Sequence, residues 1–265
     1  MEKVLLLQII AHIFADFFFQ SEKWCLSKQK KGYHSFKMYY HFGIVLLTST
    51  IMTFSCSFIP FALIIAVLHF FIDLLKSHIE RFISQKKNLQ LSENKTYNNH
   101  YIFIFDQLLH LIVIYIFVYL YMCYNAVPLY LESIDIYHLL IFLCFLLCLK
   151  PANIIIKILL SFLNLPFSPN TNNGEPQMNE DLERAGRRIG AIERLLAFML
   201  VLLGQYTAMG FILTAKSILR YNNSPLGKPE YVLIGTLLSF GIAMILGIGI
   251  TKGIFIQIIK FISFG

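Results

Sequence analysis

Uninterrupted apolar segments are the feature that most constrains how this chain can fold. A transmembrane helix needs roughly 20 predominantly apolar residues to cross the hydrocarbon core of a bilayer, and segments such as 101–123 and 230–250 supply them. Only 14% of the 265 residues are charged, against about 25% in a typical soluble domain. The chain cannot cover a soluble surface with charge, so we predict an integral membrane protein.

The apolar segments predict an all-α, polytopic transmembrane helical bundle of about seven spans. The predicted spans are residues 3–19, 39–58, 60–76, 101–123, 136–150, 190–215 and 230–250. Residues 151–165 and 253–264 are expected to form interfacial helices or bent continuations of the preceding spans. Lysine and arginine gather on one side of this arrangement. The positive-inside rule therefore places the N-terminus outside and the C-terminus inside.

A polar segment rich in Pro, Asn and Gly divides the sequence. It predicts a five-helix transmembrane part over residues 1–165, a cytoplasmic linker over 166–188 and a two-helix transmembrane part over 189–265. The net charge of +7 comes from basic residues in loops, so it indicates membrane orientation rather than nucleic acid as a partner. The five cysteines show no CxxC spacing and predict neither a disulfide framework nor a zinc ribbon.

Three predicted spans each carry a histidine and an aspartate four residues apart. The pairs are His12 with Asp16, His69 with Asp73, and Asp106 with His110. Residues four apart share one helix face. The order of the pair reverses in the span that runs in the opposite direction, which places the aspartates at one depth and the histidines about one turn, or roughly 5–6 Å, away. His41, at the start of the second span, falls near the aspartate layer.

Ionisable side chains inside a bilayer cost about 2.5–3.5 kcal/mol each on insertion scales. These seven residues must therefore face each other, water or a cation. Imidazole and carboxylate suit divalent zinc, iron or manganese, and the number of groups favours two ions, or one ion with acid–base and outer-shell groups. A metal-free proton relay or a structural His/Asp network is the alternative.

Several further residues have expected roles around this cluster. His41 is a candidate ligand or general base. Lys76 is a candidate catalytic group, although a snorkelling residue or a counter-charge is the simpler interpretation. Gln20 and Gln107 could orient ligands from the outer shell or bond between helices.

The C-terminal part carries two patterns of its own. Small residues recur every four positions at Gly235, Ser239, Ala243 and Gly247, a stripe that predicts close helix packing within the chain or in a homo-oligomer. Lys216 and Arg220, one turn apart, predict either interfacial anchoring with an ion pair or contacts to a lipid phosphate or another anion.

The motifs of the first four spans resemble those of a bacterial integral membrane family known only as a domain of unknown function. The shared patterns are H-x3-D-F-x2-Q from His12, HF-x-ID-x2-K from His69 and DQ-x2-H from Asp106. The second half, with GRRIGAIERLL and AKSILR, is similar to long members of that family. The resemblance implies a multi-pass protein of the bacterial cytoplasmic membrane and adds no activity.

The leading hypothesis is a metal-dependent membrane hydrolase that acts on a lipid-linked or amphipathic substrate at the cytoplasmic leaflet. One alternative is a cation- or proton-coupled transporter or channel that uses the same cluster. Against it, the spans show no Gly/Pro-broken middle of the kind that builds midplane sites. A non-catalytic membrane scaffold is the second alternative.

Overall fold

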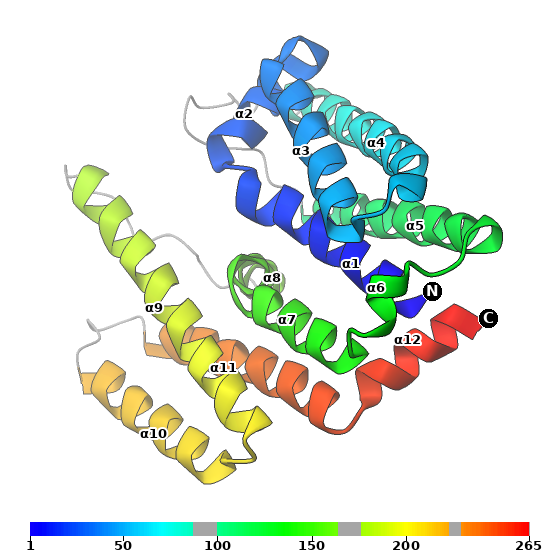
Figure 1. Ribbon diagram of the computed structural model, residues 1–265. Helices are drawn as coiled ribbons and strands as arrows, with labels where there is room; N and C mark the ends of the chain where they lie inside the picture. Colours follow the sequence, from blue (N-terminus) through cyan, green and yellow to red (C-terminus); the bar gives the residue numbers. More distant parts are fainter. Residues whose placement is uncertain (87–99, 164–175, 223–228, 265) are drawn as a thin grey trace. The chain divides into compact units, whose positions relative to one another are not determined.

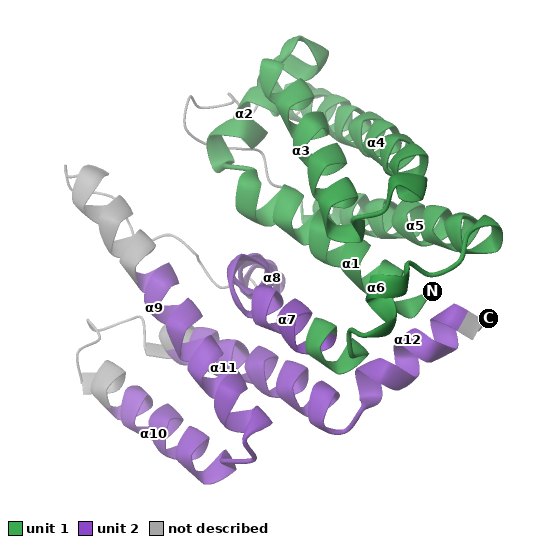
Figure 2. Cartoon of the chain, viewed as in Figure 1, with its two compact units in different colours: residues 1–139 green, residues 140–265 purple. Residues whose placement is uncertain are grey.

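The computed structural model describes residues 1–86, 100–163, 176–222 and 229–264, and these residues form helices and short connections without any strand (Figure 1). Side chains are described for residues 1–86, 100–163, 186–218 and 233–263. The chain divides into two compact units, residues 1–139 and residues 140–265 (Figure 2). The all-helical prediction is therefore confirmed for the described residues.

Unit 1 is built around four helices that pack in a closed ring. Its elements are α1 (Glu2–Ile13), the π-helical turn η1 (Phe14–Phe19), α2 (Glu22–Lys31), η2 (Gly32–His34), α3 (Phe36–Thr53), η3 (Cys56–Phe58), α4 (Ile59–Lys86), α5 (His100–Tyr124), α6 (Leu129–Glu132) and the start of α7 (Ile136–Cys148). Helix α1 packs on α3 and α5, and α4 packs on the same two helices. The shorter α2 packs on α3 and α4.

Local sequence signals explain where α2 begins and ends. The Ser21 side chain caps the helix by accepting a hydrogen bond from the backbone N–H of Trp24, which satisfies one of the free donors of the first turn. Glu22 lies in the first turn and three lysines in the last, the arrangement that the helix dipole favours. Gly32 follows with φ of +56°, a conformation that glycine adopts without steric cost and that ends the helix.

The ring encloses an apolar core at one end and polar side chains at the other. Buried apolar residues come from the first part of α1, from η3 and the first part of α4, from the last part of α5 and from the short α6. They are Val4, Leu5, Leu7, Phe58, Ala62, Ile65, Ile114, Val118, Tyr121 and Leu131. The outward faces of α4 and α5 also carry large apolar side chains, including Phe71, Leu75 and Ile112, which are more than half exposed. An apolar surface on this scale marks an interaction with lipid or another apolar partner.

By length and composition, three helices among the described residues could each cross a membrane, and up to five could if each of two bent pairs forms one span. The three are Cys56–Lys86, His100–Tyr124 and Leu233–Thr251. The bent pairs are Glu2–Phe19 with Glu22–His34, at 88°, and Ile136–Cys148 with Lys150–Phe162, at 53°. The chain is therefore consistent with a membrane protein, while the count of seven and the orientation of the termini stay predictions.

Unit 2 contains the end of α7 together with α8 (Lys150–Phe162), α9 (Pro176–Leu202), α10 (Tyr206–Asn222), α11 (Pro229–Thr251) and α12 (Ile254–Phe264). Helix α9 packs along α11, and α8 and α10 contact both of these helices. Residues 166–175 of the predicted linker lie outside the described residues.

The predicted sixth span, residues 190–215, is not one helix. Helix α9 ends at Leu202, and α10 begins at Tyr206 and packs back against α9. Gly204 lies between them with φ of +70°, in the left-handed region where a helix stops. A hydropathy pattern reads only the apolar content of a segment, so it joined two helices across this glycine.

Candidate metal centre

The four ring helices of unit 1 bring all seven predicted histidines and aspartates into one cluster. His12 lies at the end of α1 and Asp16 in η1, His41 comes from α3, His69 and Asp73 from α4, and Asp106 and His110 from α5. Six of the seven side chains are buried, and Asp16 is nearly so. Three overlapping groups of these residues could each hold a metal ion: His12 with Asp16 and His69, His41 with His69 and Asp73, and Asp73 with Asp106 and His110.

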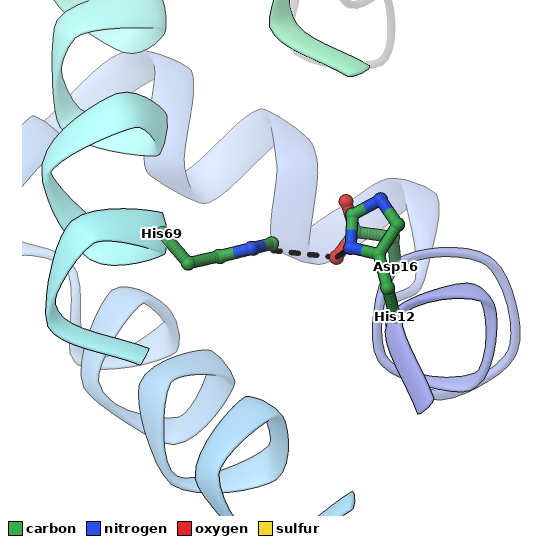
Figure 3. Close-up of side chains that lie close together, drawn as sticks. All are labelled: His12, Asp16 and His69. Atoms are coloured by element: carbon green, nitrogen blue, oxygen red, sulfur yellow. Dashed lines mark ion pairs between the residues drawn. The ribbon is translucent and has the colours of Figure 1, made fainter. Parts of the chain in front are cut away.

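Asp16 Oδ1 is surrounded by imidazole nitrogens. It lies 3.3 Å from His41 Nε2, 3.3 Å from His69 Nε2 and 3.8 Å from His12 Nδ1, and the two Nε2 atoms are 3.0 Å apart. Figure 3 shows His69 reaching from α4 toward Asp16, with the His12 ring beside the carboxylate. Ligands about 2.0–2.1 Å from a tetrahedral ion lie roughly 3.3 Å from each other. These separations therefore match the edges of one coordination tetrahedron.

Buried polar atoms that lack a hydrogen-bond partner support the same interpretation. Asp16 Oδ1, Asp106 Oδ1 and both ring nitrogens of His110 are buried without a hydrogen-bond partner among the described residues. Buried polar atoms are normally hydrogen-bonded, and an exception calls for an explanation such as an ion. Buried His/Asp groups of this kind could hold a metal ion.

The backbone of η1 sets the position of Asp16. Residues Phe14–Phe19 form a π-helical turn, which closes wider hydrogen-bonded rings than an α-helix and is often found at functional sites. Asp16 is consequently closer to imidazoles on α3 and α4 than to His12 on its own helix. The π turn was not predicted, because four-residue spacing assumes regular α-helix.

Gln107 fixes the orientation of His12. Its amide nitrogen donates to Asp16 Oδ2 at 3.3 Å and to Asp106 Oδ2 at 3.2 Å, so its oxygen is the atom that faces His12 Nε2, at 3.3 Å. That oxygen can only accept, and Nε2 must therefore carry the proton. Nδ1 of His12 is left with its lone pair toward Asp16, as a metal ligand requires. Among the described residues, Gln20 makes no hydrogen bond to the cluster.

Two lysines complete the other side of the cluster. Lys76 Nζ donates to Asp106 Oδ2 at 2.8 Å, and Lys28 Nζ donates to Asp73 Oδ2. His110 lies behind both carboxylates, with Nε2 at 3.8 Å from Asp73 Oδ1 and 3.5 Å from Asp106 Oδ1. The His110 ring also stacks on His69, with centroids 3.8 Å apart, so the two halves of the cluster are in direct contact.

Lys28 is the residue that sequence analysis missed. It lies among basic residues that the positive-inside rule assigns to a cytoplasmic loop, and nothing in that pattern separates it from its neighbours. In the structure its side chain is only 5% exposed.

None of the predicted residues of unit 2 belongs to a His/Asp group among the described residues. Lys216 on α10 donates to Glu193 Oε2 on α9. The two residues meet because α10 packs back against α9. The Arg220 side chain lies outside the described residues. Ser239 accepts a hydrogen bond from Arg194 on α9, and a side chain at Gly247 would meet Val201 on α9. This part of the small-residue stripe therefore packs within the chain.

The fold and the cluster together define an all-helical protein with several helices apolar enough to span a membrane and a buried His/Asp site that could bind metal. The chain belongs to the family described as "Protein of unknown function (DUF3307)", whose model matches residues 4–140. No curated protein and no solved structure matches the chain.

Proposed function

We propose that unit 1 is a divalent-metal centre in the membrane and that it hydrolyses a lipid-linked or amphipathic substrate at the cytoplasmic leaflet. The observation that carries this proposal is Asp16 Oδ1, which is buried without a hydrogen-bond partner and lies at ligand-to-ligand distances from the imidazoles of His41 and His69. Asp16, His41 and His69 would hold the ion, and His12 or water would take the fourth position. Three protein ligands with one open position are typical of catalytic zinc sites.

A divalent ion held there would activate water and polarise a phosphoryl or carbonyl oxygen. His110 is the side chain best placed to move a proton beside it, because its Nε2 has no hydrogen-bond partner and faces two carboxylates. Lys76 is engaged by Asp106, which favours a charge-balancing role over a nucleophilic one. His41 acts in this proposal as a ligand rather than as the general base.

Metal analysis of the purified protein tests this proposal. We expect about one zinc, iron or manganese ion per chain in detergent. We expect Asp16→Asn to lower the affinity by more than the about 10- to 100-fold that outer-shell substitutions cost. Asp135→Asn is the matched control, because Asp135 is exposed and caps α7 through a bond that Asn can also accept. A wild-type chain that binds no ion under any loading condition would contradict the metal centre.

A cation- or proton-coupled transporter is the second candidate, and one observation favours it. Gln8, one turn before His12 on α1, donates to the Ser49 backbone oxygen at 2.9 Å and accepts from the Ser49 hydroxyl at 2.6 Å. Thr53 bonds the same amide. Polar groups thus extend along α1 and α3 beyond the cluster. Reconstituted liposomes separate the candidates, because lipid turnover without ion flux supports the hydrolase and the reverse supports transport.

A further inference from the structure

The carboxylates of the cluster differ in whether a lysine already neutralises them. Asp73 receives Lys28 and Asp106 receives Lys76. Asp16 receives no lysine or arginine among the described residues, and its neighbours are imidazoles and the Gln107 amide. The two lysine-paired carboxylates share one potential metal group, which His110 completes, and Asp73 also belongs to the group with His41 and His69. Asp16 belongs to the group formed with His12 and His69.

Contacts between α2 and α4 hold Lys28 in place. The Gln29 amide donates to Glu80 Oε2 at 3.2 Å, and Arg81 donates to the Gln29 backbone oxygen at 3.4 Å. The next lysine in the sequence, Lys30, is exposed, whereas Lys28 points into the cluster and is buried. A surface lysine would keep its ammonium group in water. Lys28 is therefore part of the buried site rather than a surface residue.

Charge balance then limits how many ions the cluster can take. With neutral imidazoles, three carboxylates against two ammonium groups leave one net negative charge. One divalent ion would bring the cluster to one net positive charge, and two would bring it to three. Uncompensated charge is strongly unfavourable in a buried, low-dielectric site. The net positive charge therefore opposes binding of a second ion, although His110, Asp73 and Asp106 are suitable ligands for one.

We infer that Lys28 and Lys76 act as resident cations that restrict the centre to a single divalent ion on the Asp16 side. This inference rests on the proposed metal centre and adds its occupancy. The lysines occupy the carboxylates of what would otherwise be a second metal site. They determine stoichiometry without binding the ion themselves.

The test is metal stoichiometry in the full-length protein, stripped with a chelator and titrated with Zn²⁺ in detergent. We expect one ion in the wild type, in Lys30→Met and in the charge-preserving Lys28→Arg/Lys76→Arg variant. We expect two ions in Lys28→Met/Lys76→Met. A folded double-Met variant that binds one ion, while the wild type also binds one, overturns the inference alone. Absence of an ion from the wild type and from every variant overturns the metal centre and the inference together.

A charge-balanced variant guards against failure of the double-Met protein to fold. Asp106→Asn/Lys76→Met removes one carboxylate and one ammonium group together, so the net charge of the cluster is unchanged. We expect this variant to keep one Zn²⁺ with an affinity within about threefold of wild type, a difference below 1 kcal/mol. Loss of the ion from this variant would show that Asp106 is needed for it and would overturn its assignment to the Asp16 side.

Discussion

At the residue scale, Arg194 contrasts with Lys28 and Lys76 because it faces neutral oxygens. Its Nε donates to the Cys148 backbone oxygen at 2.8 Å, and its terminal nitrogens donate to Asn153 Oδ1 and to Ser239 Oγ. Cys148 is the last residue of α7, where carbonyl groups lack helical partners. The guanidinium of Arg194 therefore supplies hydrogen-bond donors to oxygens at the break between α7 and α8. It also links α9 and α11 to that break.

Arg194→Met should destabilise unit 2 through these oxygens. It keeps an apolar chain of similar length but leaves buried acceptors without donors, at about 1–3 kcal/mol for each such group. We expect a clear fall in the midpoint of thermal unfolding in detergent. Arg188→Met is the matched control, since Arg188 lies on the same helix and is exposed. Equal midpoints for the two variants would show that the bonds of Arg194 contribute nothing to stability.

Residue spacing predicted the cluster better than it predicted the partners of the cluster. His69 with Asp73, and Asp106 with His110, lie on shared helix faces because four-residue spacing is a local property of an α-helix. The place of Lys28 depends on how α2 packs on α4, a tertiary contact that has no local signature. Sequence could therefore indicate the acids and imidazoles but not the cations that neutralise them.

At the element scale, the packing of α11 on α9 depends on a glycine. A Cβ at Gly247 would lie 2.5 Å from Val201 Cγ1 and 2.8 Å from Val201 Cβ. Real Cβ atoms do not approach so closely, so the helices would have to separate. Small residues at such positions allow close helix approach in membrane proteins.

We expect Gly247→Ala to cost about 1–3 kcal/mol, the usual range for overpacking a well-packed interface. Gly241→Ala, on the same helix, is the control, since a Cβ there meets nothing within 4 Å. Chemical unfolding in detergent would measure both. If Gly247→Ala were as stable as Gly241→Ala, the close approach of α9 and α11 would be wrong.

Helix α3 shows why hydropathy gave an uncertain count of spans. Its inner face carries His41, Thr48, Ser49 and Thr53, all buried. These polar residues lower the mean hydropathy of α3, and the helix is not among those long and apolar enough to span a membrane alone. A hydropathy pattern cannot tell a polar residue that faces a buried cluster from one that faces water.

At the scale of the whole molecule, unit 1 and the family match nearly coincide, at residues 1–139 and 4–140. All seven cluster residues and both lysines lie within that range. The predicted boundary at 166–188 marked a change in composition, and its first part lies outside the described residues. Composition detects a polar linker but not the end of a packing unit inside an apolar helix such as α7.

Residues 1–139 alone should fold in detergent and bind one divalent ion with an affinity within about tenfold of the full chain, a difference of up to 1.4 kcal/mol. Every proposed ligand and both neutralising lysines are retained in this fragment. Size-exclusion chromatography with metal analysis would measure both properties. A folded fragment without metal, beside a metal-loaded full chain, would show that residues 140–265 contribute to the centre.

The ion pair between Lys28 and Asp73 also imposes an order on biogenesis. The two residues are 45 positions apart in the chain, and a ribosome adding about 5–20 residues per second needs about 2–9 s to make the stretch between them. Until Asp73 emerges, the Lys28 ammonium group lacks the carboxylate that it pairs with in the folded protein. The α2 helix therefore completes its packing on α4 only after α4 has been synthesised, although it precedes α4 in the chain.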